Sequence, residues 1–281
     1  MAARLALRGV ALGYLALLLA LPLAIVFFNA FGGGFHQAWA AITQPDALHA
    51  LWMTVLVTAI AVPANTIFGI ICAHALVRSD FRLKRVLDAA LDLPFAVSPV
   101  VVGLALFVVY GRTSPIGAWL LAHGIHVIFA LPGLVLATIF VSLPFVVREV
   151  APTLAEIGTE QEQAAAVLGA NAWQTFWRVT LPSIRWGVVY GVVLSTARSL
   201  GEFGAVSVVS GHLAGQTETL TLFVEDRYQA FDPVGAYTAA VVLALLAFAT
   251  LGAMNWLAAK EKNKWQSLPA TSEKASATTS P

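Results

Sequence analysis

The sequence contains few charged residues and almost no net charge. Of its 281 residues, 11% are Asp, Glu, Lys or Arg, and 16 basic against 15 acidic residues leave a formal net charge of +1. Soluble domains carry about 25% charged residues, so the composition excludes an ordinary water-soluble globule. The near neutrality also excludes the global basic field that nucleic-acid binding requires. We therefore expect no nucleic-acid partner.

Several chemical signatures are also missing. Cys72 is the only cysteine and lies in an apolar stretch, which excludes an internal disulfide and a Cys-rich metal site. No lysine follows a glycine, so the phosphate-binding pattern Gly-x4-Gly-Lys-Ser/Thr is absent and the chain cannot hydrolyse ATP by that mechanism. No His-Glu-x-x-His occurs, and His123 and His126 lack a third ligand nearby. We predict no catalytic residue, no metal site and no cofactor, hence a protein that is not an enzyme.

Long apolar runs are what the sequence has instead, at 59% hydrophobic residues. A helix needs about 20 apolar residues to cross a membrane, and spans of this kind must be helical because lipid offers the backbone no hydrogen bonds. The pattern predicts an all-α integral membrane protein with six transmembrane helices. The runs cover residues 9–31, 51–77, 91–110, 127–147, 186–209 and 234–257.

The positive charges predict the orientation. Thirteen Lys and Arg residues fall in the segments on the side of the N-terminus, whereas only Arg112 and Arg227 fall in the opposite loops. Short basic segments stay on the cytoplasmic side. We therefore expect a multi-pass protein of the cell (plasma or inner) membrane, in contact with lipid, with both termini cytoplasmic (N-in, C-in).

Three regions follow from these spans. Residues 1–46 hold the first span and an outer loop, and residues 47–258 form the membrane core, which includes a long cytoplasmic loop at 148–185. Residues 259–281 end in a run of Ser, Thr, Ala and Pro with too little apolar surface to order it, so we predict a disordered cytoplasmic tail. No clear pair of interrupted spans appears in the two halves, as an inverted-repeat transporter would require.

The cytoplasmic loop predicts a helix-turn-helix beneath the bundle. Residues 159–168 are good helix formers with acids near the start, and Gly169 provides a left-handed residue to end that helix. A second short helix carries Trp173, Phe176 and Trp177 on one face, and Pro182 limits it. This aromatic face could rest on the membrane interface, whereas the small residues of the first helix could enter a groove on another protein.

The loop resembles the EAA loop of ABC importer permeases, whose pattern is Glu-Ala-Ala-x3-Gly-x9-Ile-x-Leu-Pro. In that family the loop docks into the ATPase subunit. The chain has Gln163 where the family usually has Glu, and Val179 for Ile; Glu162 cannot simply replace the Glu because a helix turns about 100° per residue. The coupling residues that the resemblance implies are Glu162, Gln163, Ala164, Ala165, Gly169, Val179, Leu181 and Pro182.

Residues 92–101, 173–182 and 201–211 are similar to permeases of the sulfate, tungstate and molybdate branch, and residues 211–218 favour sulfate. The resemblance implies a type I ABC importer permease fold. It further implies a permease subunit for sulfate or thiosulfate that works with a sister permease, two ATPase subunits and an extracytoplasmic binding protein. The alternatives are a molybdate/tungstate permease and, more remotely, an ion-coupled secondary anion transporter, which would leave the EAA-like loop unexplained.

Two places within the spans could line a transport path. Arg198 and Glu202 stand at i and i+4 in the fifth run, near the expected midplane, where an arginine costs about 2.5–3.5 kcal/mol without a partner. They form either a structural ion pair or a path in which Arg198 attracts the anion and Glu202 holds its geometry. Ser98 either bonds a carbonyl freed by Pro99 or contacts substrate.

A last pattern lies on the outer side. Five residues recur at helical spacing and predict an amphipathic helix, either in the outer interface as a contact for a binding protein or packed against the bundle. They are Leu220, Phe223, Val224, Tyr228 and Phe231.

Overall fold

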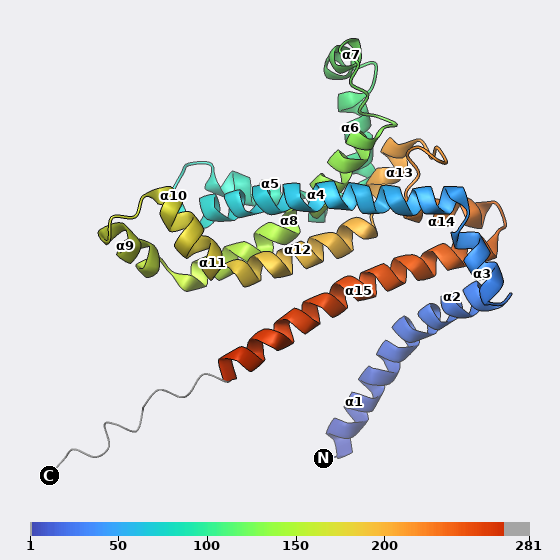
Figure 1. The fold of residues 1–281 in the computed structure, drawn as a ribbon, viewed down its shortest axis with the longest axis horizontal. Helices are drawn as coiled ribbons and strands as arrows, with labels where there is room; N and C mark the ends of the chain where they lie inside the picture. The colour runs from blue at the N-terminus through green and yellow to red at the C-terminus, as the bar shows by residue number, and fades with distance from the viewer. Residues whose placement is uncertain (1, 267–281) are drawn as a thin grey trace.

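The computed structural model describes residues 2–266, which form helices and no strand (Figure 1). The first half contains α1 (Ala2–Leu15), the π-helix η1 (Ala16–Ala20), α2 (Leu21–Phe31), α3 (Phe35–Ile42), α4 (Pro45–Arg78), α5 (Lys84–Ala96), α6 (Pro99–Tyr110) and α7 (Pro115–Ala122). The second half contains α8 (Leu131–Ile157), α9 (Glu160–Val167), α10 (Ala172–Thr175), the π-helix η2 (Phe176–Thr180), α11 (Leu181–Ser183), α12 (Arg185–Leu200), α13 (Gly204–Ser210), α14 (Leu220–Gln229) and α15 (Pro233–Gln266). The prediction of an all-helical protein is confirmed.

The centre of the bundle is α8, which packs against α4 and α12. Glycines allow this close approach: a Cβ on Gly69 of α4 would lie 2.7 Å from Cγ1 of Val146, and a Cβ on Gly191 of α12 would lie 2.9 Å from Cα of Val146. Val146 itself is fully buried. Helix α8 can therefore lie close to both α4 and α12, because each of these helices has a glycine against Val146.

The number of membrane spans depends on two bent helix pairs. Four helical stretches are long and apolar enough to cross a membrane, and there are up to six if each bent pair counts as one span. The pair α5 and α6 bends by 111°, and the pair α12 and α13 by 54°. The four stretches are Leu7–Phe31, Pro45–Arg78, Leu131–Ile157 and Pro233–Met254.

The expectation that the third and fifth runs are uninterrupted helices is wrong. Val97 and Ser98 are extended (ψ 135° and 134°), as a residue before proline prefers, and Pro99 then begins α6. The fifth run breaks at residues 201–203, where Phe203 (φ −128°) leaves the helical region. Both runs therefore form bent helix pairs, although the sequence shows no clear pair of interrupted runs.

The two breaks lie close together. A Cβ on Gly204 would lie 3.0 Å from Cβ of Pro99, and a Cβ on Gly103 would lie 2.7 Å from the carbonyl oxygen of Ala205. The second halves of the bent pairs, α6 and α13, therefore pack directly on each other. From there α6 and α7 project away from the bundle (Figure 1).

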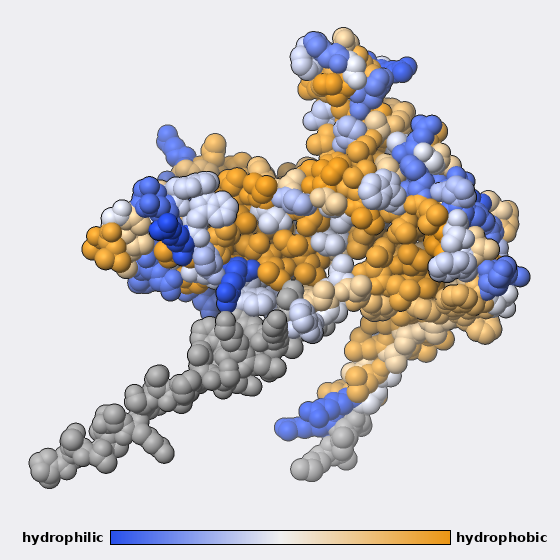
Figure 2. Space-filling view, in the orientation of Figure 1, coloured by the Kyte–Doolittle hydropathy of each residue, from blue (hydrophilic) through white to orange (hydrophobic). Residues whose placement is uncertain are grey.

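Apolar surface covers much of the molecule. The window of the N-terminal stretch Leu7–Phe31 has none of its residues buried, and α1 diverges from the bundle in Figure 1. Figure 2 shows hydrophobic residues over the middle of the molecule and hydrophilic ones toward its two ends, near α9 and near α14. Exposed apolar surface of this extent marks contact with lipid or another protein.

Two helix ends differ from the sequence predictions. Helix α8 continues beyond residue 147 to Ile157, because Leu154 packs with Ile184 in a buried cluster. Helix α15 continues to Gln266, so residues 259–266 of the expected disordered tail are helical, as their Ala, Lys and Glu content favours. Residues 267–281 of that tail lie outside the described residues.

The outer amphipathic pattern belongs to the core and not to an interface helix. Leu220 and Phe223 of α14 are buried against Ala47, Ala50 and Ala239. Tyr228 is exposed and Phe231 follows the end of α14. Packing against the bundle is the alternative that the structure supports.

Candidate functional site

The hairpin of the loop at residues 148–185 forms as the sequence predicts. Helix α9 spans residues 160–167, and Gly169 has a left-handed backbone (φ +86°) that reverses the chain. Asn171 and Gln174 then form a capping box, in which the Gln174 amide donates to the Asn171 side chain (2.8 Å) and the Asn171 amide donates to Gln174 (3.1 Å). The second helix continues through Pro182, because Pro182 takes an early position in α11 just after the wider π-turn of η2.

Glu162 fixes this hairpin to the bundle. Its carboxylate forms an ion pair with Arg78 at the end of α4 (2.9 Å) and accepts a hydrogen bond from the Thr180 hydroxyl (2.8 Å). Arg78 also donates to the carbonyl of Gly158. The side chains of Arg78 and Glu162 are only 11% and 20% exposed. Glu162 therefore positions the hairpin, because its carboxylate contacts α4 and the second helix of the hairpin.

The outward side of α9 carries small and apolar residues. Gln163 is exposed and donates only to Thr159 within its own helix (3.0 Å), and Ala164 is exposed while Ala165 is half-buried. Val167 and Leu168 are 87% and 88% exposed. We call Gln163, Ala164, Val167 and Leu168 the hairpin tip; Figure 2 shows apolar residues at this end of the molecule. The sequence reasoning missed Val167 and Leu168, although an apolar pair just before the turn glycine was a usable signal.

The aromatic face of the second helix is divided. Trp173 and Trp177 are 70% and 50% exposed, whereas Phe176 is half-buried and meets the ring of His74 edge-on at 6.5 Å. Of the remaining motif residues, Val179 and Leu181 are half-buried and Pro182 is exposed. The tryptophans thus extend the apolar surface of the hairpin tip.

Arg198 and Glu202 pair across a helix break. Arg198 lies in the last turn of α12, and its guanidinium is 2.6 Å from the Glu202 carboxylate, with side-chain exposures of 29% and 2%. The other oxygen of Glu202 accepts from the Ala205 amide (2.9 Å), so Glu202 caps the start of α13. The expectation of one continuous helix face is wrong here. The pair instead connects the two halves of the bent span.

Buried hydroxyl and amide groups surround this joint. Asn65 and Ser199 both donate to the Ser142 hydroxyl, at 2.8 and 3.2 Å, and Thr54 accepts from the Leu220 amide (2.7 Å). Thr54, Ser199 and Glu202 line a cavity of about 10 Å³, which is about the space of one water. The joint is therefore closed to an oxyanion in this conformation. The sequence reasoning did not identify this cluster, because its members come from four separate segments.

Ser98 lies at the other break. It precedes Pro99, the first residue of α6, and its side chain does not cap that helix. Because Pro99 stands at a helix start, it frees no carbonyl inside a helix, and the predicted internal bond of Ser98 to such a carbonyl is wrong. Ser98 is exposed and lies beside the contact between Pro99 and Gly204.

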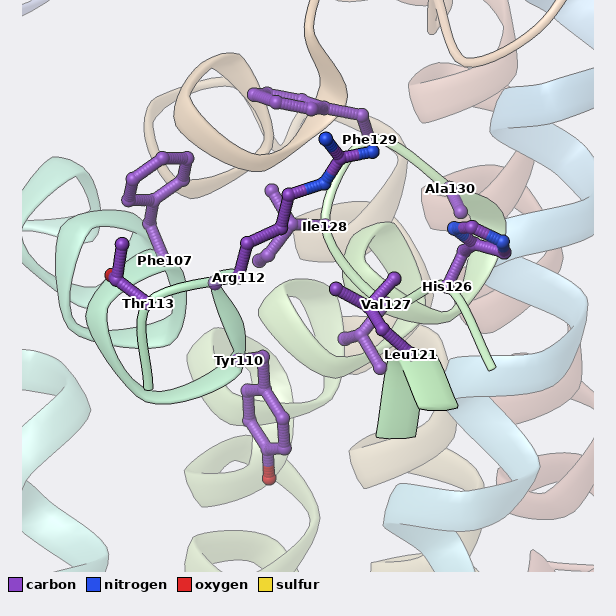
Figure 3. A pocket seen from close by; sticks show the side chains of 11 residues that line it. Phe107, Tyr110, Arg112, Thr113, Leu121, His126, Val127, Ile128, Phe129 and Ala130 are labelled. Atoms are coloured by element: carbon purple, nitrogen blue, oxygen red, sulfur yellow. The ribbon is translucent and has the colours of Figure 1, made fainter. Parts of the chain in front are cut away.

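A much larger pocket than the one at the joint lies between the end of α6 and the start of α8. It measures about 710 Å³ and has a mainly apolar wall. Figure 3 shows Arg112 extending through it toward Phe129, with His126 near Ala130. His123 binds the carbonyl of Trp119 (2.8 Å) and does not line the pocket with His126. The pocket therefore offers cationic groups but no cluster of metal ligands.

Replacing Arg198 tests the joint. We expect Arg198→Ala to lower the stability of the solubilised chain by about 3 kcal/mol, because it leaves the buried Glu202 carboxylate unpaired. The double variant Arg198→Ala/Glu202→Gln should recover part of this loss, since the amide oxygen can still cap Ala205 without a charge. Thermal unfolding in detergent measures both, with the exposed Arg178→Ala as control. A double variant no more stable than the single one would contradict the structural role.

The comparisons with known proteins agree with these features. The chain is 51% identical over 247 residues (88% of this chain and 86% of the relative) to the sulfate transport system permease protein CysW of Synechococcus elongatus. It is 38% identical over 244 residues (87% and 88%) to CysT, a second sulfate transport system permease protein of that organism. Its fold matches a bacterial alginate ABC transporter, solved in complex with an alginate pentasaccharide-bound periplasmic protein, with a TM-score of 0.72, 16% identity, and coverage of 90% of this chain and 92% of the other.

The family assignment rests on a match across most of the chain. The model of the family described as "Binding-protein-dependent transport system inner membrane component" matches residues 65–263, which include the hairpin, both helix breaks and most of α15. The chain therefore belongs to the family of binding-protein-dependent transport system inner membrane components.

Proposed function

We propose that this chain is a permease subunit of an ATP-driven importer for sulfate or thiosulfate, and that it forms half of the translocation pathway. The observation that carries the substrate assignment is the 51% identity to a sulfate transport permease over 88% of the chain. The residues of the EAA-like loop support the coupling to ATP hydrolysis. The chain has no phosphate-binding loop of its own, so the energy must come from a separate ATPase subunit.

The hairpin tip is the contact that we assign to that ATPase. The small and apolar residues of the hairpin tip would let α9 enter a groove on the ATPase. The ion pair between Arg78 and Glu162 holds α9 against α4. Gln163 is a neutral side chain at the position where the family usually has Glu, so we expect a hydrogen bond there in place of a salt bridge. Movement of the ATPase would reach the bundle through Glu162 and through Val179 and Leu181, which pack at the base of the hairpin.

The remaining partners follow from the relatives. One organism has both CysW and CysT among its sulfate transport permeases, which supports a heterodimer of this chain with a CysT-like sister. The solved neighbour binds a periplasmic protein, which supports an extracytoplasmic binding protein that delivers the anion. The exposed apolar surfaces of α1, α6 and α7 are available to the sister permease and to lipid.

We infer six spans, with each bent pair crossing once and both termini in the cytoplasm. This arrangement puts the hairpin and the basic segments on the cytoplasmic side and α14 on the outer side, as the distribution of Lys and Arg favours. Arg198 is the group that we assign to the path wall: its side chain is 29% exposed beside the closed joint, where it can attract an anion once the halves of the span separate. Ser98, at the neighbouring break, would line the same path.

Reconstitution tests the proposal. We expect vesicles that contain this chain, a CysT-like permease, the ATPase and a sulfate-binding protein to accumulate radiolabelled sulfate only with ATP, with competition by thiosulfate and little by molybdate. The control is Leu168→Glu, which should insert normally but lose uptake because it adds a charge to the apolar tip. Uptake that persists without the ATPase and collapses with the proton gradient would contradict the proposal and favour a secondary transporter.

A further inference from the structure

A second group of polar residues gathers at the outer end of the bundle, far from the hairpin (Figure 1). Asp226 and Glu225 stand side by side near the end of α14, and His212 lies in the turn that follows α13. One ligand atom from each of the three side chains lies within 4.8 Å of the other two. All three residues are partly buried. The function proposed above makes no use of this cluster.

The distances suit a shared metal ion. His212 Nδ1 lies 3.1 and 3.3 Å from the two carboxylate oxygens of Asp226. In a tetrahedral site with bonds of 2.0–2.1 Å, neighbouring ligand atoms are about 3.3 Å apart. A carboxylate oxygen of Glu225 lies within 4.8 Å of the other two ligand atoms and completes the set. One imidazole with two carboxylates is a donor set for Zn²⁺ and related divalent ions.

The position of His212 is held by the fold. Its backbone is left-handed (φ +52°), an uncommon conformation for a residue other than glycine. The amide of His212 donates to the Ser210 hydroxyl (3.3 Å), which in turn donates to the carbonyl of Thr217 (2.7 Å). Ser210 and Thr217 are both buried. This network keeps the imidazole in place before any ion binds.

A further buried acidic side chain, Glu218, lies next to Asp226. Glu218 is only 4% exposed, and no donor in the described part of the chain reaches its Oε2. The nearby Arg227 pairs with Asp46 (3.6 Å) and Asp232 (4.0 Å). An excess of negative charge thus surrounds Asp226.

We propose that His212, Glu225 and Asp226 bind one divalent transition-metal ion of the Zn²⁺ class at the outer end of the bundle, with the carboxyl group of Glu218 behind Asp226. The ion would tie the turn after α13 to α14, and so hold the outer half of the bent span to the bundle core.

Zinc binding to the purified chain tests this proposal without any transport assay. We expect the full-length chain, stripped with a chelator and dialysed against Zn²⁺, to retain one Zn²⁺ per chain by elemental analysis. Glu225→Gln and His212→Ala should each weaken binding by about tenfold or more. Glu225→Gln can keep its contact with Gln229, and its unfolding temperature without zinc should equal that of the unmodified chain. His126→Ala is the matched control and should leave binding unchanged.

Two results would overturn the proposal. One is a chain that retains no Zn²⁺ above the background, which would leave His212 and Asp226 as a hydrogen-bonded pair only. The other is Zn²⁺ binding that is as tight in Glu225→Gln and His212→Ala as in the unmodified chain, which would place the ion elsewhere.

Discussion

Gly191→Leu is expected to prevent the bundle from forming. A Cβ at this position would lie 2.9 Å from Cα of Val146, which is backbone and cannot rotate away. Helix α8 has little room to shift, because Gly69 of α4 also lies close to Val146. Overpacking costs about 1–3 kcal/mol, and more where backbone must move. We expect most of this variant to be lost as aggregate when membranes are solubilised, with a clearly lower unfolding temperature in the remainder.

The matched control is Gly252→Leu in α15, where nothing lies within 4 Å of an added Cβ. It makes the same change within a helix and should leave the solubilised yield and the unfolding temperature nearly unchanged. Size-exclusion chromatography and thermal unfolding measure the two variants side by side. Equal yields would show that α8 and α12 are not packed as closely as described.

Glu162→Ala is expected to uncouple the hairpin while the bundle remains intact. The change removes the partner of Arg78 and the acceptor for the Thr180 hydroxyl, and unpaired, partly buried groups of this kind cost about 1–3 kcal/mol. We expect this cost to destabilise the hairpin, whose tip is exposed, and not the bundle. We expect ATP-driven sulfate uptake to fall by about tenfold or more, with normal insertion into the membrane.

The control for this variant is Glu160→Ala, an exposed acid in the first turn of the same helix, which should retain most of the uptake. Glu162→Gln should fall between the two, because an amide can still accept from Thr180 but loses the charge that faces Arg78. Proteolysis of the hairpin gives a second measurement, and only Glu162→Ala should be cut markedly faster. Normal uptake by Glu162→Ala would mean that this ion pair does not transmit movement.

The hairpin was predictable because its signals are local. Helix propensity and acids near the start define α9 within residues 159–168, and Gly169 is the residue type that accepts a left-handed backbone. The excess of apolar residues likewise determined that the protein is helical and belongs in a membrane, since lipid leaves the backbone no other partner.

The continuity of the spans was not predictable from hydropathy. The two interrupted runs are apolar enough to count as spans, and hydropathy does not register how residues near Pro99 and Gly204 pack against each other. The ends of α8 and α15 were also misplaced, because a helix continues past its apolar run wherever its side chains find contacts, as Leu154 does with Ile184.

The sequence alone determined the class of the protein, its apolar segments and the hairpin with its motif, because each depends on residues a few positions apart. Only the tertiary structure decided which charges meet. Glu162 finds Arg78 from 84 positions away, and His212 meets Asp226 from 14. Such pairs depend on how the helices bend and pack, and that follows from contacts across the whole chain.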